Sequence, residues 1–151
     1  MSLWSLMAAP LFYSGDMRRL DDFTLNVLCN PEVIEVDQDP LGKCAEVHVL
    51  GTKTFVMVKE MEDGSRAVGL FNRGWFATPV TASWTDVGLK GRCLVRDLWR
   101  QKDLGVFEDH FEVKVPHRGA VVVRIRPFGT MSSQQRNPYA IDRTLPRALQ
   151  G

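Results

Sequence analysis

The sequence contains few of the residues from which small proteins build cross-links and metal sites. It has three cysteines, Cys29, Cys44 and Cys93, an odd count with no CxxC or Cys/His spacing. Neither a disulfide framework nor a structural zinc site is therefore indicated, and we interpret the cysteines as buried free thiols. The three histidines stand singly in different segments, which argues against a histidine-based metal centre. We expect no metal ion and no cofactor.

Long apolar runs and a surplus of one charge are also missing. No run approaches the roughly 20 apolar residues that a membrane-spanning helix requires, so we expect no membrane partner. The chain has 19 Lys and Arg against 18 Asp and Glu, with no basic stripe interleaved with aromatic residues, which argues against nucleic-acid binding. The 151 residues, 44% hydrophobic and 25% charged, are enough for one globular domain with its own core.

The first residues have a helical pattern that breaks early. Four apolar residues spaced three and four apart share one helical face: Leu3, Trp4, Leu6 and Met7. Pro10 disfavours helical backbone in the residue before it, so the helix must end near residue 9. Because so short a helix is not stable alone, the pattern predicts the end of a longer helix packed on a partner.

A short apolar run follows the proline. Residues 11–13 read Leu-Phe-Tyr and precede a turn and a new helical pattern. This order is typical of a βα unit, and an unbroken apolar run suits a parallel strand that is buried on both faces. No second α/β unit follows, so we expect the rest of that sheet upstream of Met1.

Two further short helices are predicted before residue 43. Asp21 or Asp22 can cap the first. Asn30 followed by Pro31 can begin the second, since proline fits the first helical position, and residues 37–40 end it. We explain the neighbouring carboxylates in these segments by helix capping rather than by acid/base chemistry.

From residue 44 onward the apolar pattern changes to a period of two. Candidate strands are residues 45–50, 54–59, 67–72, 80–84, 93–98, 111–115 and 120–125, each bounded by turn residues. Seven or eight short strands with hairpin-length links predict an antiparallel β-sandwich, with one face of each strand in the core and the other in water. Residues 129–151 show no sustained period, and we expect them to be disordered or to lie along the surface.

The tryptophans of this region divide into two groups. Trp84 and Trp99 stand in apolar strand patterns and are expected in the core. Trp75, beside Phe76 in a predicted loop, is the plausible exposed platform on which a sugar ring could stack.

Two parts of the chain together resemble one enzyme family. The chain begins with SLWSLMAAPLFYSGDMRRL and continues with NPEVIEVDQDPLGK, which resembles the last βα unit of the barrel in the alpha-galactosidase (melibiase) glycoside hydrolases of clan D. The later stretches VGLFNRG and VRDLWRQKDLG resemble the C-terminal β-sandwich of that family in the same order. The matches cover about residues 1–128. The resemblance implies a remnant of a (β/α)8 barrel over residues 1–42, a mainly β domain over residues 43–128, and a tail over residues 129–151.

The resemblance also bears on the chemistry. In that family two aspartates at the ends of barrel strands four and six act as nucleophile and acid/base in a retaining mechanism, which needs carboxyl groups about 5 to 5.5 Å apart. Neither motif occurs in this sequence, so no catalytic residue is assigned and we expect the chain alone to be inert. Asp16 is the nearest candidate, because it follows the expected eighth barrel strand and barrel active sites lie at that end. It either braces the loop and the following helix or, with Ser14, forms the outer wall of the substrate site.

Two functions therefore stay open. The first is the C-terminal part of a hydrolase whose whole enzyme releases terminal α-linked galactose or N-acetylgalactosamine, and the barrel-like start favours it. A truncated gene, a late start codon or an expressed fragment would each explain that start. The second is a non-catalytic sandwich module that binds carbohydrate or another protein.

Two further expectations concern the start of the chain. Unpartnered apolar residues within residues 1–20 predict self-association. No Lys or Arg precedes the apolar start, so a signal peptide is not indicated. The compartment of the parent enzyme stays open, with secreted and periplasmic locations included.

Overall fold

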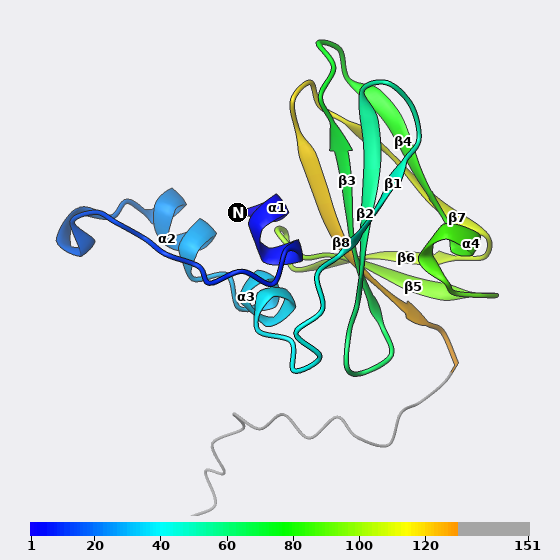
Figure 1. Ribbon diagram of the computed structural model, residues 1–151, viewed down its shortest axis with the longest axis horizontal. Helices are drawn as coiled ribbons and strands as arrows, with labels where there is room; N and C mark the ends of the chain where they lie inside the picture. The colour runs from blue at the N-terminus through cyan, green and yellow to red at the C-terminus, as the bar shows by residue number, and fades with distance from the viewer. Residues whose placement is uncertain (130–151) are drawn as a thin grey trace, which may run out of the picture.

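The computed structural model describes residues 1–129 and contains two antiparallel sheets with short helices beside them (Figure 1). The larger sheet has six strands in the order β1-β2-β3-β8-β5-β6, and the smaller sheet pairs β4 with β7. The strands are β1 (Glu46–Val49), β2 (Thr54–Glu60), β3 (Arg66–Asn72), β4 (Thr78–Ser83), β5 (Cys93–Asp97), β6 (Lys102–Phe107), β7 (His110–Val115) and β8 (Ala120–Pro127). The predicted antiparallel β-sandwich is confirmed. The expectation for the tail lies outside the described residues, apart from Gly129.

The period-two pattern located seven of these strands and missed β6. That strand is an edge strand whose first three residues are exposed, so it lacks the alternation of apolar and polar residues that marks a half-buried strand. The pattern also extended β4 one residue too far. Trp84 instead begins the helix α4 (Trp84–Val87), where the hydroxyl of Ser83 accepts a hydrogen bond from the Thr85 N–H.

The main core lies between the two sheets. Apolar residues from alternate positions of both sheets meet there, including Val56, Leu70, Val80, Phe111 and Ile125. Trp84 is 3% exposed and donates its indole N–H to the Gly91 carbonyl at 2.9 Å. Its expected place in the core is confirmed.

A second core covers the opposite face of the larger sheet. Met57 of β2, Ala67 of β3 and Val122 of β8 point away from the main core and pack with residues near the start of the chain, namely Leu6, Val33 and Val36, which are fully buried. The expectation that this face of the strands meets water is therefore wrong for β2, β3 and β8. The N-terminal segment removes the face from solvent.

That segment contains four short helices. They are α1 (Ser2–Leu6), the 3-10 helix η1 (Met17–Arg19), α2 (Asp22–Leu28) and α3 (Pro31–Asp37). The predicted caps are confirmed: the Asp21 carboxylate accepts from the Thr24 N–H, and the Asn30 side chain accepts from the first turn of α3, with Pro31 at its first position. Figure 1 shows α1 and α3 beside the larger sheet and α2 farther out.

The predicted strand at residues 11–13 does not form. These residues have irregular backbone, and Phe12 is 79% exposed. A strand requires a neighbouring backbone with which to exchange hydrogen bonds. Among residues 1–129 no segment pairs with this one.

The cysteines agree with the sequence interpretation only in part. All three are free thiols, but only Cys93 is buried, whereas Cys29 and Cys44 are exposed. Burial raises the pKa of the Cys93 thiol. The prediction of burial is wrong for the two cysteines that lie in connecting segments, where no second layer of the fold covers them.

Candidate functional site

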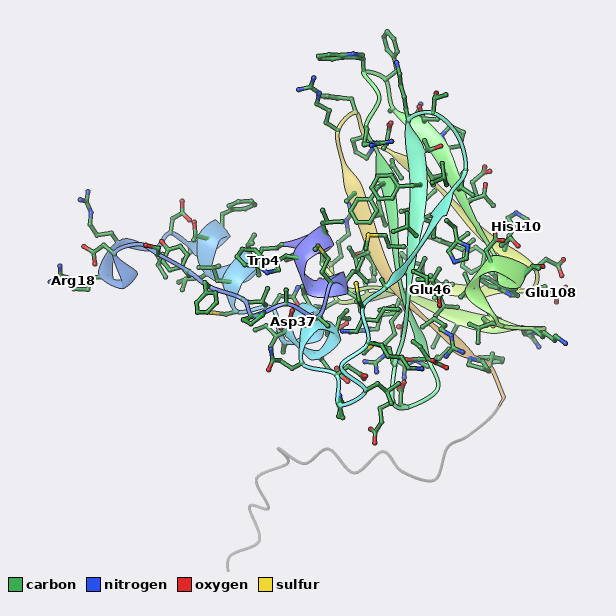
Figure 2. All side chains as sticks on the ribbon, in the orientation of Figure 1. Trp4, Arg18, Asp37, Glu46, Glu108 and His110 are labelled. Atoms are coloured by element: carbon green, nitrogen blue, oxygen red, sulfur yellow. The ribbon has the colours of Figure 1, made fainter. Side chains whose placement is uncertain are left out.

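Asp16 and Ser14 lie in one exposed turn before η1. The Asp16 Oδ1 accepts hydrogen bonds from the Arg18 backbone N–H at 3.0 Å and from the Arg18 Nε at 3.1 Å. The hydrogen bond from the Arg18 side chain is the main reason why the pKa of Asp16 lies below its ordinary value. Arg18 stands far from the sandwich (Figure 2). Asp16 braces this turn in the described structure, and no second carboxylate pairs with it there.

The most developed polar site joins α3 to the larger sheet. Arg96 on β5 donates to Glu32 of α3 through two bonds, Nε to Oε2 at 2.9 Å and Nη2 to Oε1 at 2.7 Å. The same guanidinium reaches Asp103 at 3.1 Å and the Gln101 carbonyl at 2.8 Å. The hydrogen bond to Glu32 is the main reason why the pKa of Arg96 is raised. This bidentate pairing fixes the orientation of the guanidinium relative to the carboxylate as well as the distance between them.

A second arginine connects α3 to the β2–β3 hairpin. Arg124 on β8 is 9% exposed and donates to Glu35 at 2.8 Å, to Asp63 at 3.1 Å and to the Ser65 hydroxyl at 2.8 Å. Burial alone would lower the pKa of Arg124, but the bonds to Glu35 and the charge of Asp63 outweigh it and raise the pKa. The guanidinium therefore stays charged in the second core.

Lys59 on β2 contributes a third cation to this interface. Its side chain is fully buried, and its Nζ donates to the Val36 carbonyl near the end of α3. Burial lowers the pKa of Lys59, and the nearby carboxylates of Asp39 and Asp37 oppose that shift. A lysine at this place satisfies a carbonyl that the last turn of a helix leaves without an internal partner.

Asp39 and Asn30 complete the connections between the segment and the sandwich. The Asp39 carboxylate accepts from the Leu41 N–H at 3.1 Å and from the Glu62 N–H at 3.0 Å. The Asn30 side chain also donates to the Leu98 carbonyl at 2.9 Å. Helix capping is therefore the wrong explanation for Asp39, which binds the β2–β3 hairpin instead.

Two open hollows flank the start of α1. The first, of about 460 Å³, is largely apolar and is lined by Met1, Ser2, Phe23, Asn26, Val27 and Trp99. Trp99 is only half-buried there and donates its indole N–H to the Ser2 hydroxyl at 2.9 Å, so its expected core position holds only in part. The second, of about 560 Å³, lies between α1 and one end of the sandwich, with Phe55, Phe71, Arg73 and Arg118 among its lining residues.

Trp75 and Phe76 are the exposed aromatic residues at that end. Trp75 is 64% and Phe76 is 82% exposed, which confirms the prediction that Trp75 lies in the open. The Arg118 guanidinium carbon stands 3.9 Å from the centroid of the Trp75 ring, a distance at which a cation and an aromatic face attract each other.

Within residues 1–129 no group of three or more His, Cys, Asp or Glu side chains is placed to hold a metal ion. None of the helices in this range is long and apolar enough to cross a bilayer.

Family models of known proteins match both sides of the interface between α3 and the larger sheet. The family model described as "Alpha galactosidase A" matches residues 1–39, and the model of the "Alpha galactosidase C-terminal beta sandwich domain" matches residues 51–125. The first match contains α3, and the second contains the strands that pair with it, β5 with Arg96 and most of β8 with Arg124. Both matches are to one family of glycoside hydrolases. The chain belongs to the alpha-galactosidase family and corresponds to the C-terminal part of its members.

Individual relatives agree with this assignment. A probable alpha-galactosidase of Dictyostelium discoideum is 32% identical over 132 residues, which are 83% of this chain and 34% of that protein. The alpha-galactosidase of Coffea arabica is 40% identical over 104 residues, 65% of this chain and 26% of its own length. The chain spans about a quarter to a third of the curated relatives it matches.

Solved structures share the fold. Alpha-galactosidase I from Mortierella vinacea superposes with a TM-score of 0.78 at 27% identity, over 82% of this chain and 33% of that one. A GH27 β-L-arabinopyranosidase from Geobacillus stearothermophilus gives a TM-score of 0.80 at 26% identity, over 87% of this chain and 30% of its own.

Sequence reasoning did not identify the residues that join α3 to the sheet. Arg124 stands in the run Val-Val-Val-Arg-Ile-Arg, and an arginine in an otherwise apolar strand is a signal for a buried ion pair. The sequence does not indicate which carboxylate pairs with Arg124, because Glu35 lies 89 positions away.

Proposed function

We propose that this chain is the C-terminal part of an enzyme that releases terminal α-linked galactose through a retaining mechanism with two carboxylates. Residues 1–42 form the end of the catalytic (β/α)8 barrel in this proposal, and residues 43–128 form the accompanying sandwich. The two aspartates of the mechanism belong to other parts of the enzyme. The chain itself supplies the last barrel helices and the domain that holds them.

The docking of α3 onto the larger sheet carries the proposal. Glu32 and Glu35 belong to the segment matched by the catalytic-domain model, and Arg96 and Arg124 belong to the segment matched by the sandwich model. Ion pairs between these segments make the sandwich a support for the barrel end. This arrangement favours the enzyme part over an independent binding module, because the segment that packs on the sheet also carries large apolar side chains that stay exposed.

The outer side of the N-terminal segment supports the same proposal. Large apolar side chains there stay open to solvent, with exposed fractions of 37% to 79%: Trp4, Met7, Phe12, Tyr13 and Phe23. We infer that the rest of the barrel covers them in the whole enzyme, and that copies of the isolated chain associate through residues 1–20. Leu6 takes no part in that contact, since it is fully buried against the sheet.

Asp16 and Ser14 have a modest role in this proposal. We infer that they stand in the loop after the last barrel strand, where Asp16 with Arg18 keeps the loop in shape at the outer wall of the substrate site. Neither residue is proposed to touch the reacting bond.

A chimeric enzyme tests the proposed function. The barrel of the Mortierella vinacea enzyme is joined to this chain in place of its own C-terminal third, and release of nitrophenol from a nitrophenyl α-galactoside is measured. We expect activity from the chimera and none from this chain alone, because removal of a nucleophile or an acid/base costs orders of magnitude in rate.

The controls are the barrel without any C-terminal part and the unaltered Mortierella vinacea enzyme. Activity of this chain alone that survives repurification would contradict the proposal. So would a chimera that folds, by circular dichroism, yet is no more active than the barrel without its C-terminal part.

A further inference from the structure

Three loops meet at the end of the sandwich opposite the β2–β3 hairpin (Figure 1). They are residues 50–53, 73–77 and 116–119, here called the cationic end. The Arg73 N–H donates to the Lys53 carbonyl at 2.8 Å, and the Arg118 N–H donates to the Gly74 carbonyl at 3.2 Å. These bonds hold the three loops together as one surface.

A buried asparagine makes this surface rigid. Asn72 is 2% exposed, and its side-chain amide donates to the Phe76 carbonyl at 2.8 Å and to the Val115 and Pro116 carbonyls at 3.1 Å. Its Oδ1 accepts from the Gly74 N–H at 2.8 Å. The loop that carries Trp75 and Phe76 is therefore preorganised, which lowers the entropy that binding must overcome.

All charged side chains of the cationic end are positive. Lys53, Arg73 and Arg118 are exposed there, together with His117, and the three loops contain no acidic residue. The Asn72 side-chain amide forms its hydrogen bonds within the fold, so it is not available to a ligand. A neutral sugar offers hydroxyl groups that both donate and accept, whereas this surface offers mainly donors, so it is matched to a partner rich in negatively charged oxygen atoms.

Two neighbouring aromatic side chains project from the same surface. Phe76 has no polar atom and is 82% exposed, and Trp75 is 64% exposed with Arg118 against its ring. A sugar ring can stack its apolar C–H face on one of these aromatic rings, but a neutral sugar has no charge to pair with the neighbouring cations. A bilayer gives both rings suitable surroundings, because aromatic side chains favour the headgroup region while neighbouring cations pair with anionic headgroups.

We propose that the cationic end docks on bilayers that contain anionic lipids, with Trp75 and Phe76 entering the headgroup region and Lys53, Arg73 and Arg118 pairing with phosphate or carboxylate groups. The expectation of no membrane partner came from the lack of a spanning segment. A peripheral contact needs no such segment.

Flotation of the full chain with lipid vesicles tests this proposal. We expect binding to vesicles of phosphatidylcholine with about 30% phosphatidylserine, weak binding to pure phosphatidylcholine, and release between about 50 and 500 mM salt. Replacing Lys53 and Arg73 by Gln should weaken binding roughly fivefold for each cation. Phe76→Ser should weaken it further without changing the melting temperature, since the ring makes little contact with the fold.

The chain offers a matched control at Arg92 and Phe128. This pair is also an exposed cation beside an aromatic ring, at 5.1 Å, but it lies outside the cationic end. Arg92→Gln and Phe128→Ser should leave vesicle binding within about twofold. Equal losses in the control and test variants would overturn the proposal, because binding would then depend only on overall charge.

The alternative partner is an anionic polysaccharide, and polygalacturonate, which is soluble and acidic, serves as its probe. Binding to it that depends on Arg73 but not on Phe76, without binding to anionic vesicles, would overturn the bilayer proposal. These readouts do not involve α-galactoside hydrolysis, so they are independent of the function proposed for the whole enzyme.

Discussion

Arg124 shows how a charged residue can occupy a core position. It stands between Val123 and Ile125 on β8, and its side chain enters the second core with only 9% exposure. A buried cation is tolerated when its donors are satisfied by carboxylates and other acceptors. Glu35, Asp63 and Ser65 supply those acceptors from two different elements.

The Asp63 carboxylate gives this cluster a measurable pH dependence. Burial opposes ionisation, but hydrogen bonds from Ser65 and the charge of Arg124 outweigh it, so the pKa of Asp63 lies below its ordinary 3.8. A carboxyl group whose pKa is lower in the folded state stabilises the fold above its unfolded pKa, and this contribution is lost as pH falls through the folded pKa.

We expect Asp63→Asn to lower the free energy of unfolding by about 1 kcal/mol at neutral pH, since Asp63 is partly open to solvent. The difference from the unaltered chain should shrink below about pH 4 as the native carboxylate also loses its charge. Urea unfolding between neutral pH and about pH 2 measures it. Asp86→Asn on α4 is the control, because Asp86 forms no ion pair within residues 1–129. A difference that is constant with pH would contradict the assigned role.

At the scale of elements, α3 is the part that joins the two matched segments. It has only seven residues, too few for a helix to be stable alone. Val33 and Val36 bury its apolar side, and charged residues near both ends pair with cations of the sheet. Tertiary contacts therefore determine whether this helix forms.

Exchanging the charges of the Glu32–Arg96 pair tests that dependence. Glu32→Arg or Arg96→Glu alone should lower the free energy of unfolding by roughly 3 kcal/mol, because each leaves like charges together in a half-buried site. The double variant should recover roughly 1 to 2 kcal/mol of the summed loss. Thermal and urea unfolding measure the cycle, with Lys90→Glu as an exposed control. Strict additivity of the two single losses would mean that the pair does not position α3.

The sequence predicted elements well where they depend on local pattern. The period of two identified the β-sandwich, and the sequence Asn30-Pro31 identified the start of α3. The prediction failed where distant residues decide the outcome. Residues 11–13 have strand composition but no pairing partner among residues 1–129, and β6 is a strand because β5 pairs with it despite its exposed residues.

The same contrast between local and distant contacts applies to the candidate site. The exposure of Trp75 and the local bond between Asp16 and Arg18 follow from turn residues near each in the sequence. The pairs Glu32–Arg96 and Glu35–Arg124 join residues 64 and 89 positions apart. Their register depends on how the helix crosses the sheet, and a single sequence does not determine that crossing.

At the scale of the whole molecule, the N-terminal segment has two sides with different roles. Its inner side is packed on the sandwich through Leu6 and α3, whereas α2 has no buried residue. We infer that α3 and the sandwich form one structural unit and that the outer side packs against the rest of the enzyme.

Hydrogen exchange of the full chain, resolved by segment, tests this claim most directly. Amide protons exchange slowly where opening requires loss of buried contacts and quickly where helices are exposed. We predict that amides near the end of α3, at Val36 and Asp37, exchange at rates close to those of β2 and β3, while the amides of α2 near Val27 and Leu28 exchange much faster. Equal, fast exchange in α3 and α2 would contradict the claim, because the N-terminal segment would then be separate from the sandwich.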